Sequence, residues 1–244
     1  MKNIILIAMI LTAAGGYAQT VVNKSYPVQA GQKINLHFDY PELVRVTTWD
    51  KNEISVQGSV SINSGENDDA FVLEQSVSGG TIYVRNEINN MKNLPHRVTI
   101  SKGGKKITFR SDAEYKKYRS ENGGDYEYVT NGVDMDITLE IKVPKNTATF
   151  VESVYGMVEV KSFNGPLDVD ATYGGVDVSI AERTTGIVKA ETSYGQIYTD
   201  LAVKFTGSEF KDFHTQVSAK LGTGPDYDVE SKYGNVYLRK NAAQ

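Results

Sequence analysis

A short motif recurs along the C-terminal half of the chain, and its even spacing constrains the fold more than any other feature of the sequence. In each copy a Tyr-Gly pair is followed by apolar or small residues at the third and fifth positions after the Tyr. The copies begin at Tyr155, Tyr173, Tyr194 and Tyr233, and a degenerate copy begins at His214. Neighbouring copies start 18 to 21 residues apart. Five copies at this spacing predict that the region is built from repeated structural units.

Each unit is predicted to contain two short strands separated by glycine corners. Apolar and polar residues alternate after each Tyr-Gly pair and also before it, which is typical of strands with one buried face. Gly and Pro allow the sharp changes of chain direction between the strands. The predicted inward-facing residues are Thr149, Val151, Val158, Val160, Leu167, Val169, Val176, Val178, Val188, Ala190, Ile197, Thr199, Ser208, Phe210, Val217, Ala219, Tyr227, Val229, Val236 and Leu238.

Stacking explains why the same residue types recur at the same place in every unit. A repeat of this kind buries its apolar face only against the next repeat, roughly 4.8 Å away along the stack. We therefore expect an all-β protein that forms a single elongated parallel β-helix, or β-solenoid, with short two-stranded coils. Residues 146–244 form the regular solenoid in this interpretation.

The preceding part of the chain, residues 19–145, is predicted to form irregular β coils or a cap that shields the first edge of the solenoid. Trp49, the only tryptophan, is expected to pack within this region. Residues 89–131 interrupt the pattern as an insertion. Within it, residues 98–109 predict a hairpin with a Gly-Gly turn, and residues 112–120 predict a short helix capped by Ser111 or Asp112.

The insertion is rich in basic side chains, which cluster over residues 102–119. A projecting basic hairpin could contact phosphorylated glycans or lipid headgroups by charge attraction. A solvated loop whose charges serve only solubility is the alternative. The basic residues are Lys102, Lys105, Lys106, Arg110, Lys116, Lys117 and Arg119.

The N-terminal residues 1–18 are predicted to be a signal peptide. A lysine precedes an apolar run that ends in small residues, and we place cleavage after Ala18. The chain has no cysteine, which excludes disulfides, thiolate metal ligands and a lipid-attachment cysteine. No transmembrane segment is predicted in the mature chain. We therefore expect an exported protein that is periplasmic, at the cell surface or extracellular.

Four segments carry a resemblance to a known family. These are the Tyr-Gly-x-Val-x-Val units, the lead-in at residues 133–144, the ending at 233–240 and an opening strand set around 46–56. With them the chain resembles the putative-adhesin domain family, a family of unknown function found in exported bacterial proteins whose members look like right-handed β-helices. The resemblance implies an adhesin-like role and transfers no binding residues.

The sequence lacks the groupings that carry common catalytic chemistry. His37, His96 and His214 share no metal-ligand spacing, and neither a Gly-x-Ser-x-Gly elbow nor a phosphate-binding loop is present. A net charge of −4 is too mild to indicate a nucleic-acid partner. We predict a protein that is not an enzyme, with no catalytic, cofactor-binding or metal-binding residues and no cofactor.

Two groups of residues keep functional alternatives open. Asp168, Asp170 and Asp177 are expected on successive outward positions, where paired carboxylates could cleave a glycan or hold calcium. The Tyr column of the repeats either packs at the solenoid corner or binds sugars through its aromatic rings.

The preferred function is a non-catalytic, adhesin-like module that binds an unknown envelope glycan, another extracellular polymer or a protein. The alternatives are a carbohydrate-active β-helix enzyme that uses surface carboxylates, and a passive envelope scaffold with weak self-association.

Overall fold

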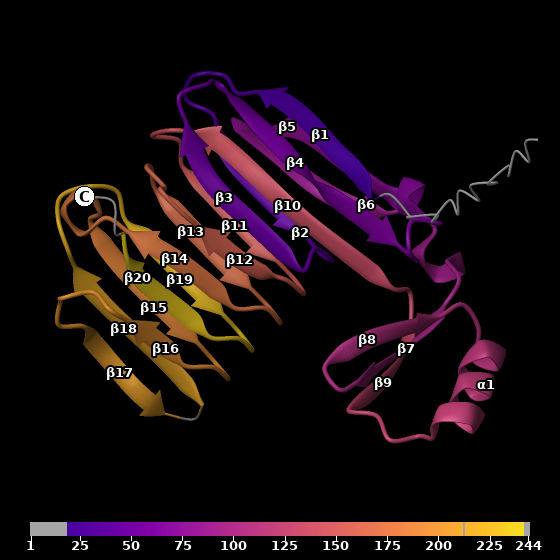
Figure 1. The fold of residues 1–244 in the computed structure, drawn as a ribbon. Helices are drawn as coiled ribbons and strands as arrows, with labels where there is room; N and C mark the ends of the chain where they lie inside the picture. Colours follow the sequence, from indigo (N-terminus) through magenta and orange to yellow (C-terminus); the bar gives the residue numbers. More distant parts are fainter. Residues whose placement is uncertain (1–18, 212, 242–244) are drawn as a thin grey trace, which may run out of the picture.

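The computed structural model describes residues 19–211 and 213–241, which form two large facing sheets and a smaller lobe (Figure 1). The all-β class is confirmed, since α1 (Asp112–Asn122) is the only α-helix among the described residues. No helix in the described part of the chain is long and apolar enough to cross a membrane. The predicted signal peptide and its cleavage site after Ala18 lie outside the described residues.

Sheet A and sheet B make up the main body. The strand order of sheet A is β1 (Thr20–Pro27), β4 (Glu53–Ile62), β10 (Met135–Pro144), β3 (Leu43–Trp49), β12 (Met157–Val160), β14 (Val176–Ile180), β20 (Val236–Lys240) and β16 (Ile197–Thr199). The order of sheet B is β17 (Thr206–Lys211), β18 (His214–Lys220), β15 (Ile187–Thr192), β19 (Tyr227–Ser231), β13 (Leu167–Ala171), β11 (Thr149–Ser153), β2 (Lys33–Phe38), β6 (Thr81–Ile88) and β5 (Phe71–Ser78).

Five segments each give one strand to sheet B and the next strand to sheet A. We call them coil 1 (33–49), coil 2 (149–160), coil 3 (167–180), coil 4 (187–199) and coil 5 (227–240). Their strands pair in parallel with those of the neighbouring coils. Alternate residues of both sheets point into one shared core.

The core contains most of the residues that the repeat pattern places inside. Val158, Val176 and Val236 are fully buried, and burial of one such side chain contributes about 1.5–3 kcal/mol relative to exposure. Ile197 is only partly buried and Thr199 is exposed, because β16 is an edge strand of sheet A. The side chains of Ser208 and Phe210 lie outside what the structure describes.

The coils do not stack in chain order. Tyr227 of coil 5 is the Cα partner of Leu167 in coil 3 and also of Val188 in coil 4. In sheet A, β20 likewise lies between β14 and β16. Coil 5 is therefore inserted between coils 3 and 4, and the expectation that each coil packs against the next is wrong at this point.

The degenerate copy at His214 is not a coil. It forms β18, which pairs antiparallel with β15 on one side and with β17 on the other. Its partly buried Val217 and buried Ala219 follow an alternating pattern, but an antiparallel hairpin has the same alternation as a coil. The spacing of 18 to 21 residues could not distinguish the two.

Antiparallel strands also extend the opposite end of the body, so both large sheets are mixed. In sheet A, β4 pairs antiparallel with β1 and β10, and in sheet B, β5 pairs antiparallel with β6. At the coil 4 end, Leu201 is buried, and Val203 and Phe205 pack against the core. Trp49 is partly buried, and its indole nitrogen donates a hydrogen bond to the Glu53 carbonyl oxygen.

The lobe is the predicted insertion. Strands β7 (Arg97–Lys102) and β8 (Lys105–Phe109) form the expected hairpin, and β9 (Tyr128–Gly132) adds a third strand that the sequence did not indicate. Of the two predicted helix caps, Ser111 is the one used, since its hydroxyl oxygen accepts a hydrogen bond from the Glu114 amide. Helix α1 packs Tyr115 and Tyr118 onto the lobe's small core.

The remaining described elements are three short 3-10 helices, which lie in links between strands. They are η1 (Asp68–Ala70), η2 (Met91–Asn93) and η3 (Glu182–Thr184).

Candidate functional site

A groove with a volume of about 430 Å³ crosses the outer face of sheet B. Outward-facing side chains from six neighbouring strands follow one another along it, because each is the Cα partner of the next. In order across the sheet, this groove row is Tyr83, Asn35, Phe150, Asp168, Asp228 and Lys189.

The row combines apolar rings with hydrogen-bonding groups on a rigid support. Inward neighbours such as Ile34 and Val169 are buried, so the alternation of each strand fixes the row on the outer face. Aromatic faces and carboxylate or amide groups are the side chains that bind an amphipathic ligand such as a sugar. Strand spacing places successive row positions roughly 4.8 Å apart.

Charges in the groove are only partly neutralised within the chain. The Lys189 ammonium lies 3.3 Å from an oxygen of Asp228, while Asp226 accepts a hydrogen bond of 2.7 Å from the Ile187 amide. Burial, followed by the negative charges of Asp228 and Asp170, raises the pKa of Asp168. The groove therefore has acceptor groups directed at a donor-rich ligand.

A second row lies beside the groove, two residues further along five of the same strands, from β2 to β15. It is formed, in order, by His37, Glu152, Asp170, Glu230 and Glu191. We call these residues the acidic row. Burial and neighbouring carboxylates raise the pKa values of Asp170 and Glu230.

Histidines lie at both ends of the acidic row. His37 contacts Glu152 at 2.7 Å and Asp39 at 2.9 Å. Burial lowers the pKa of His37, but the hydrogen bonds and charges of Glu152 and Asp39 outweigh it, so the pKa is raised overall. His214 lies 3.4 Å from Glu191.

The structure brings Asp168 and Asp170 together on sheet B but separates them from Asp177. Asp177 lies on β14 of sheet A, where both of its carboxylate oxygens accept hydrogen bonds from Arg239. The expected cluster of three aspartates is therefore wrong. Sequence reasoning also missed Asp228 and Glu230 as neighbours of Asp168 and Asp170, since coil 5 enters the stack out of chain order.

The three histidines are far apart in the fold, and His96 is exposed in the link before β7. Among residues 19–211 and 213–241, no group of three or more His, Asp or Glu side chains is arranged to hold a metal ion.

The repeat tyrosines stack on one another in a continuous aromatic ladder. The rings follow the order Tyr40, Tyr155, Tyr173, Tyr233, Tyr194 and Phe213, with centroid separations of 5.0 to 6.1 Å. Phe213, and not His214, takes the ladder position next to Tyr194. The interplanar angles between neighbouring rings are 8 to 22°, so the rings are nearly parallel. Each interior ring therefore has a neighbouring ring on both of its faces. This favours a packing role, since a sugar would need a free face.

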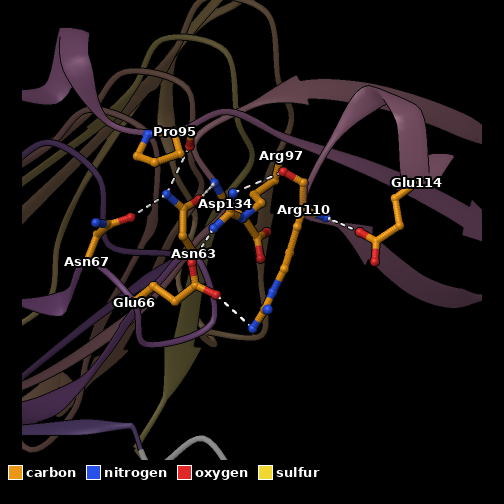
Figure 2. Close-up of polar contacts among 8 residues, drawn as sticks. All are labelled: Asn63, Glu66, Asn67, Pro95, Arg97, Arg110, Glu114 and Asp134. Carbon is orange, nitrogen blue, oxygen red and sulfur yellow. Dashed lines mark hydrogen bonds and ion pairs between the residues drawn. The ribbon is translucent and has the colours of Figure 1, made fainter.

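The lobe is fastened to the main body by a polar joint (Figure 2). One oxygen of Glu66 lies 2.6 Å from Arg97 and the other lies 2.9 Å from Arg110. The buried Asn63 amide donates hydrogen bonds to the side chain of Asn67 and to the Pro95 carbonyl, and its oxygen accepts one from the Asp134 amide.

The basic insertion is consequently less available to a partner than its composition indicates. Arg110 contacts Glu66, Lys106 lies 2.8 Å from Asp134, and Lys116 lies 2.6 Å from Asp112. Three of the seven basic side chains of the insertion are thus paired with carboxylates of the chain.

Comparisons with known proteins give distant likenesses only. No family model matches the chain, and no curated protein matches it. The similar solved structures include a putative cell adhesion protein from Clostridium sporogenes ATCC 15579 and a putative adhesin from Bacteroides fragilis NCTC 9343. The first is 10% identical, with 91% of this chain and 100% of that chain covered and a TM-score of 0.45. The second is also 10% identical, with 92% and 98% covered and a TM-score of 0.21. With both TM-scores below 0.5, neither likeness carries an argument about function.

Proposed function

We propose that this protein is an exported, non-catalytic β-solenoid module with an adhesin-like role, and that it binds an envelope or extracellular glycan along the groove of sheet B. The observation that carries the proposal is the groove row, in which two aromatic and four polar side chains follow one another at strand spacing across one rigid face. A linear glycan presents one sugar unit after another along its length, and the row presents one side chain from each successive strand.

A glycan fits this surface better than an extended peptide does. Same-face side chains of an extended peptide recur roughly every 6.6 to 6.8 Å, whereas the row recurs roughly every 4.8 Å. One pyranose unit in an extended chain advances the polymer by close to the strand spacing. The apolar rings of Tyr83 and Phe150 support sugar faces, and Asn35, Asp168 and Asp228 bond to hydroxyls.

The test is binding of the mature protein to a glycan array and then to the best polysaccharide in solution. Tyr83→Ala and Asp168→Asn are each expected to raise the dissociation constant about 10-fold, since each substitution removes a contact of about 1.4 kcal/mol. Tyr198→Ala is the matched control, because Tyr198 is an exposed tyrosine on β16 of sheet A, away from the groove. Equal weakening by the control, or no glycan bound by the unmodified protein, would contradict the proposal.

The second candidate is a glycan-cleaving enzyme, and the raised pKa values of Asp168 and Asp170 favour it. Two carboxyl groups that flank a glycosidic bond can serve as general acid and as base or nucleophile. We expect no release of reducing ends from any polysaccharide that binds. Turnover that disappears in Asp168→Asn or Asp170→Asn would replace the first candidate by the second.

A further inference from the structure

Coil 5 occupies a slot whose two walls are both formed by earlier parts of the chain. On one side Tyr227 and Val236 pair with Leu167 and Val176 of coil 3. On the other side, the strands of coil 5 pair in parallel with β15 and β16 of coil 4. The strands that pair with coil 5 on its two sides therefore all lie within residues 167–199.

The fit of coil 5 in the slot is close and chemically specific. The Ser231 hydroxyl donates a 2.7 Å hydrogen bond to the Gly174 carbonyl of coil 3, and the Thr192 hydroxyl of coil 4 donates one of 2.9 Å to the Gly234 carbonyl. Arg239 holds Asp177 of coil 3 at 2.7 Å. Each of these contacts joins coil 5 to a wall, so none depends on which copy of the chain supplies the coil.

Residues 221–226 connect coil 5 to the preceding hairpin. They include Gly222, Gly224 and Pro225. An element of this kind can leave its own fold and enter the identical site of a second copy at low cost, because its contacts with the walls are remade there.

We propose that coil 5 is an exchangeable element, and that the coil 5 of one copy inserts between coils 3 and 4 of a second copy and links the two. The linked copies keep complete grooves, since Asp228 of the inserted coil takes its place in the receiving groove row. Two linked grooves bind one polymer with an effective concentration that a single groove lacks. The exchange itself stands whether or not the groove binds a glycan.

Paired single-cysteine variants of the mature full-length chain test the exchange, because the chain has no cysteine of its own. Asp177 and Tyr237 are Cα partners on β14 and β20, at a spacing within the range of a disulfide. Asp177→Cys chains and Tyr237→Cys chains are unfolded, mixed, refolded together and oxidised. Exchange is expected to give a disulfide-linked dimer that the same two variants do not give when they are mixed after folding.

The matched control replaces Tyr237→Cys with Glu159→Cys. Glu159 is the Cα partner of Asp177 on its other side, but it belongs to coil 2, which does not exchange. A dimer yield from Glu159→Cys and Asp177→Cys equal to that from the test pair would reveal random collision and overturn the proposal. A second readout needs no variants. Light scattering of unmodified protein refolded at rising concentration is expected to show a growing dimer fraction, and monomer at every concentration would also overturn it.

Discussion

Carboxylates of the acidic row lie beside like charges across neighbouring strands. Glu152 pairs with Asp170, Asp170 with Glu230, and Glu230 with Glu191. Like charges in such positions each cost roughly 0.2–1 kcal/mol. The pKa of Asp170 is raised by burial and then by the charge of Glu152, so the ionised form of Asp170 is disfavoured in the fold. The face is therefore maintained at the expense of stability, as is common for binding surfaces.

Asp170→Asn is expected to raise the free energy of unfolding at pH 7 by about 0.5 kcal/mol, because it removes one charge from the acidic row. The folded pKa of Asp170 lies above its ordinary value of 3.8, so the ionised form is disfavoured in the fold. The loss of stability caused by ionised Asp170 is absent below pH 3.8 and grows as the pH rises through the pKa of Asp170 in the folded state. Urea titrations at pH 3.5 and pH 7 measure the difference.

Asp136→Asn is the control for this change, because the cross-strand partner of Asp136 on β4 is the neutral Ser61. No gain in stability is expected from it. A gain for Asp170→Asn that is the same at both pH values would rule out charge repulsion as its cause.

Gly174→Ala tests the close approach of the coils at the Tyr-Gly corners. A Cβ at Gly174 would lie 1.9 Å from the Gly156 carbonyl oxygen, and backbone cannot yield as a flexible side chain does. We expect a loss of about 3 kcal/mol, measured by thermal unfolding. Gly132→Ala is the control, since its Cβ would meet no atom within 4 Å. Equal melting temperatures for the two variants would contradict the close approach.

Among the elements, the lobe shows how a polar joint can replace a hydrophobic interface. Strand β7 starts at Arg97, whose side chain is only 7% exposed, and its guanidinium contacts Glu66 in the turn after β4. A buried cation without its partner is costly, so the joint has one favoured arrangement. The contacts of Glu66 with Arg97 and Arg110 therefore favour the observed orientation of the lobe on the main body.

Glu66→Gln is expected to loosen the lobe, because it removes the negative charge between Arg97 and Arg110. The partly exposed pair should cost about 2 kcal/mol when broken, less than a fully buried one. Hydrogen exchange of β7 to β9 measures the effect. Glu74→Gln, which breaks an exposed pair with Arg85, should leave exchange in the lobe unchanged. Unchanged exchange in both variants would show that the joint does not hold the lobe.

At the scale of the whole molecule, sequence patterns predicted the strands well and their order less well. Alternation and glycine corners place Val158, Val176 and Val236 in the core because burial follows local periodicity. The position of coil 5 had no such signal. The links before coil 3 and before coil 4, residues 161–166 and 181–186, are of equal length, although the second one passes over an entire coil.

The same gap in the sequence signal explains the errors in the candidate site. Asp168 and Asp170 were correctly placed outward, but their neighbours Asp228 and Glu230 come from the inserted coil. Asp177 was assigned to the same surface because outward positions in consecutive strands look alike in sequence, whereas consecutive strands of one coil belong to opposite sheets. Phe150 has no charge and no conserved place in the repeat pattern that would indicate a site residue. Its role as a site candidate follows only from its position in the groove.

The aromatic ladder should give the folded protein a characteristic circular dichroism spectrum. Tyr173, Tyr233 and Tyr194 lie with ring centroids 5.0 to 5.2 Å apart and nearly parallel, so their electronic transitions couple. Such coupling produces a strong near-ultraviolet circular dichroism band that isolated tyrosines lack. Because Tyr233 lies between Tyr173 and Tyr194, the band should reach its full strength during refolding only when coil 5 takes its place in the stack.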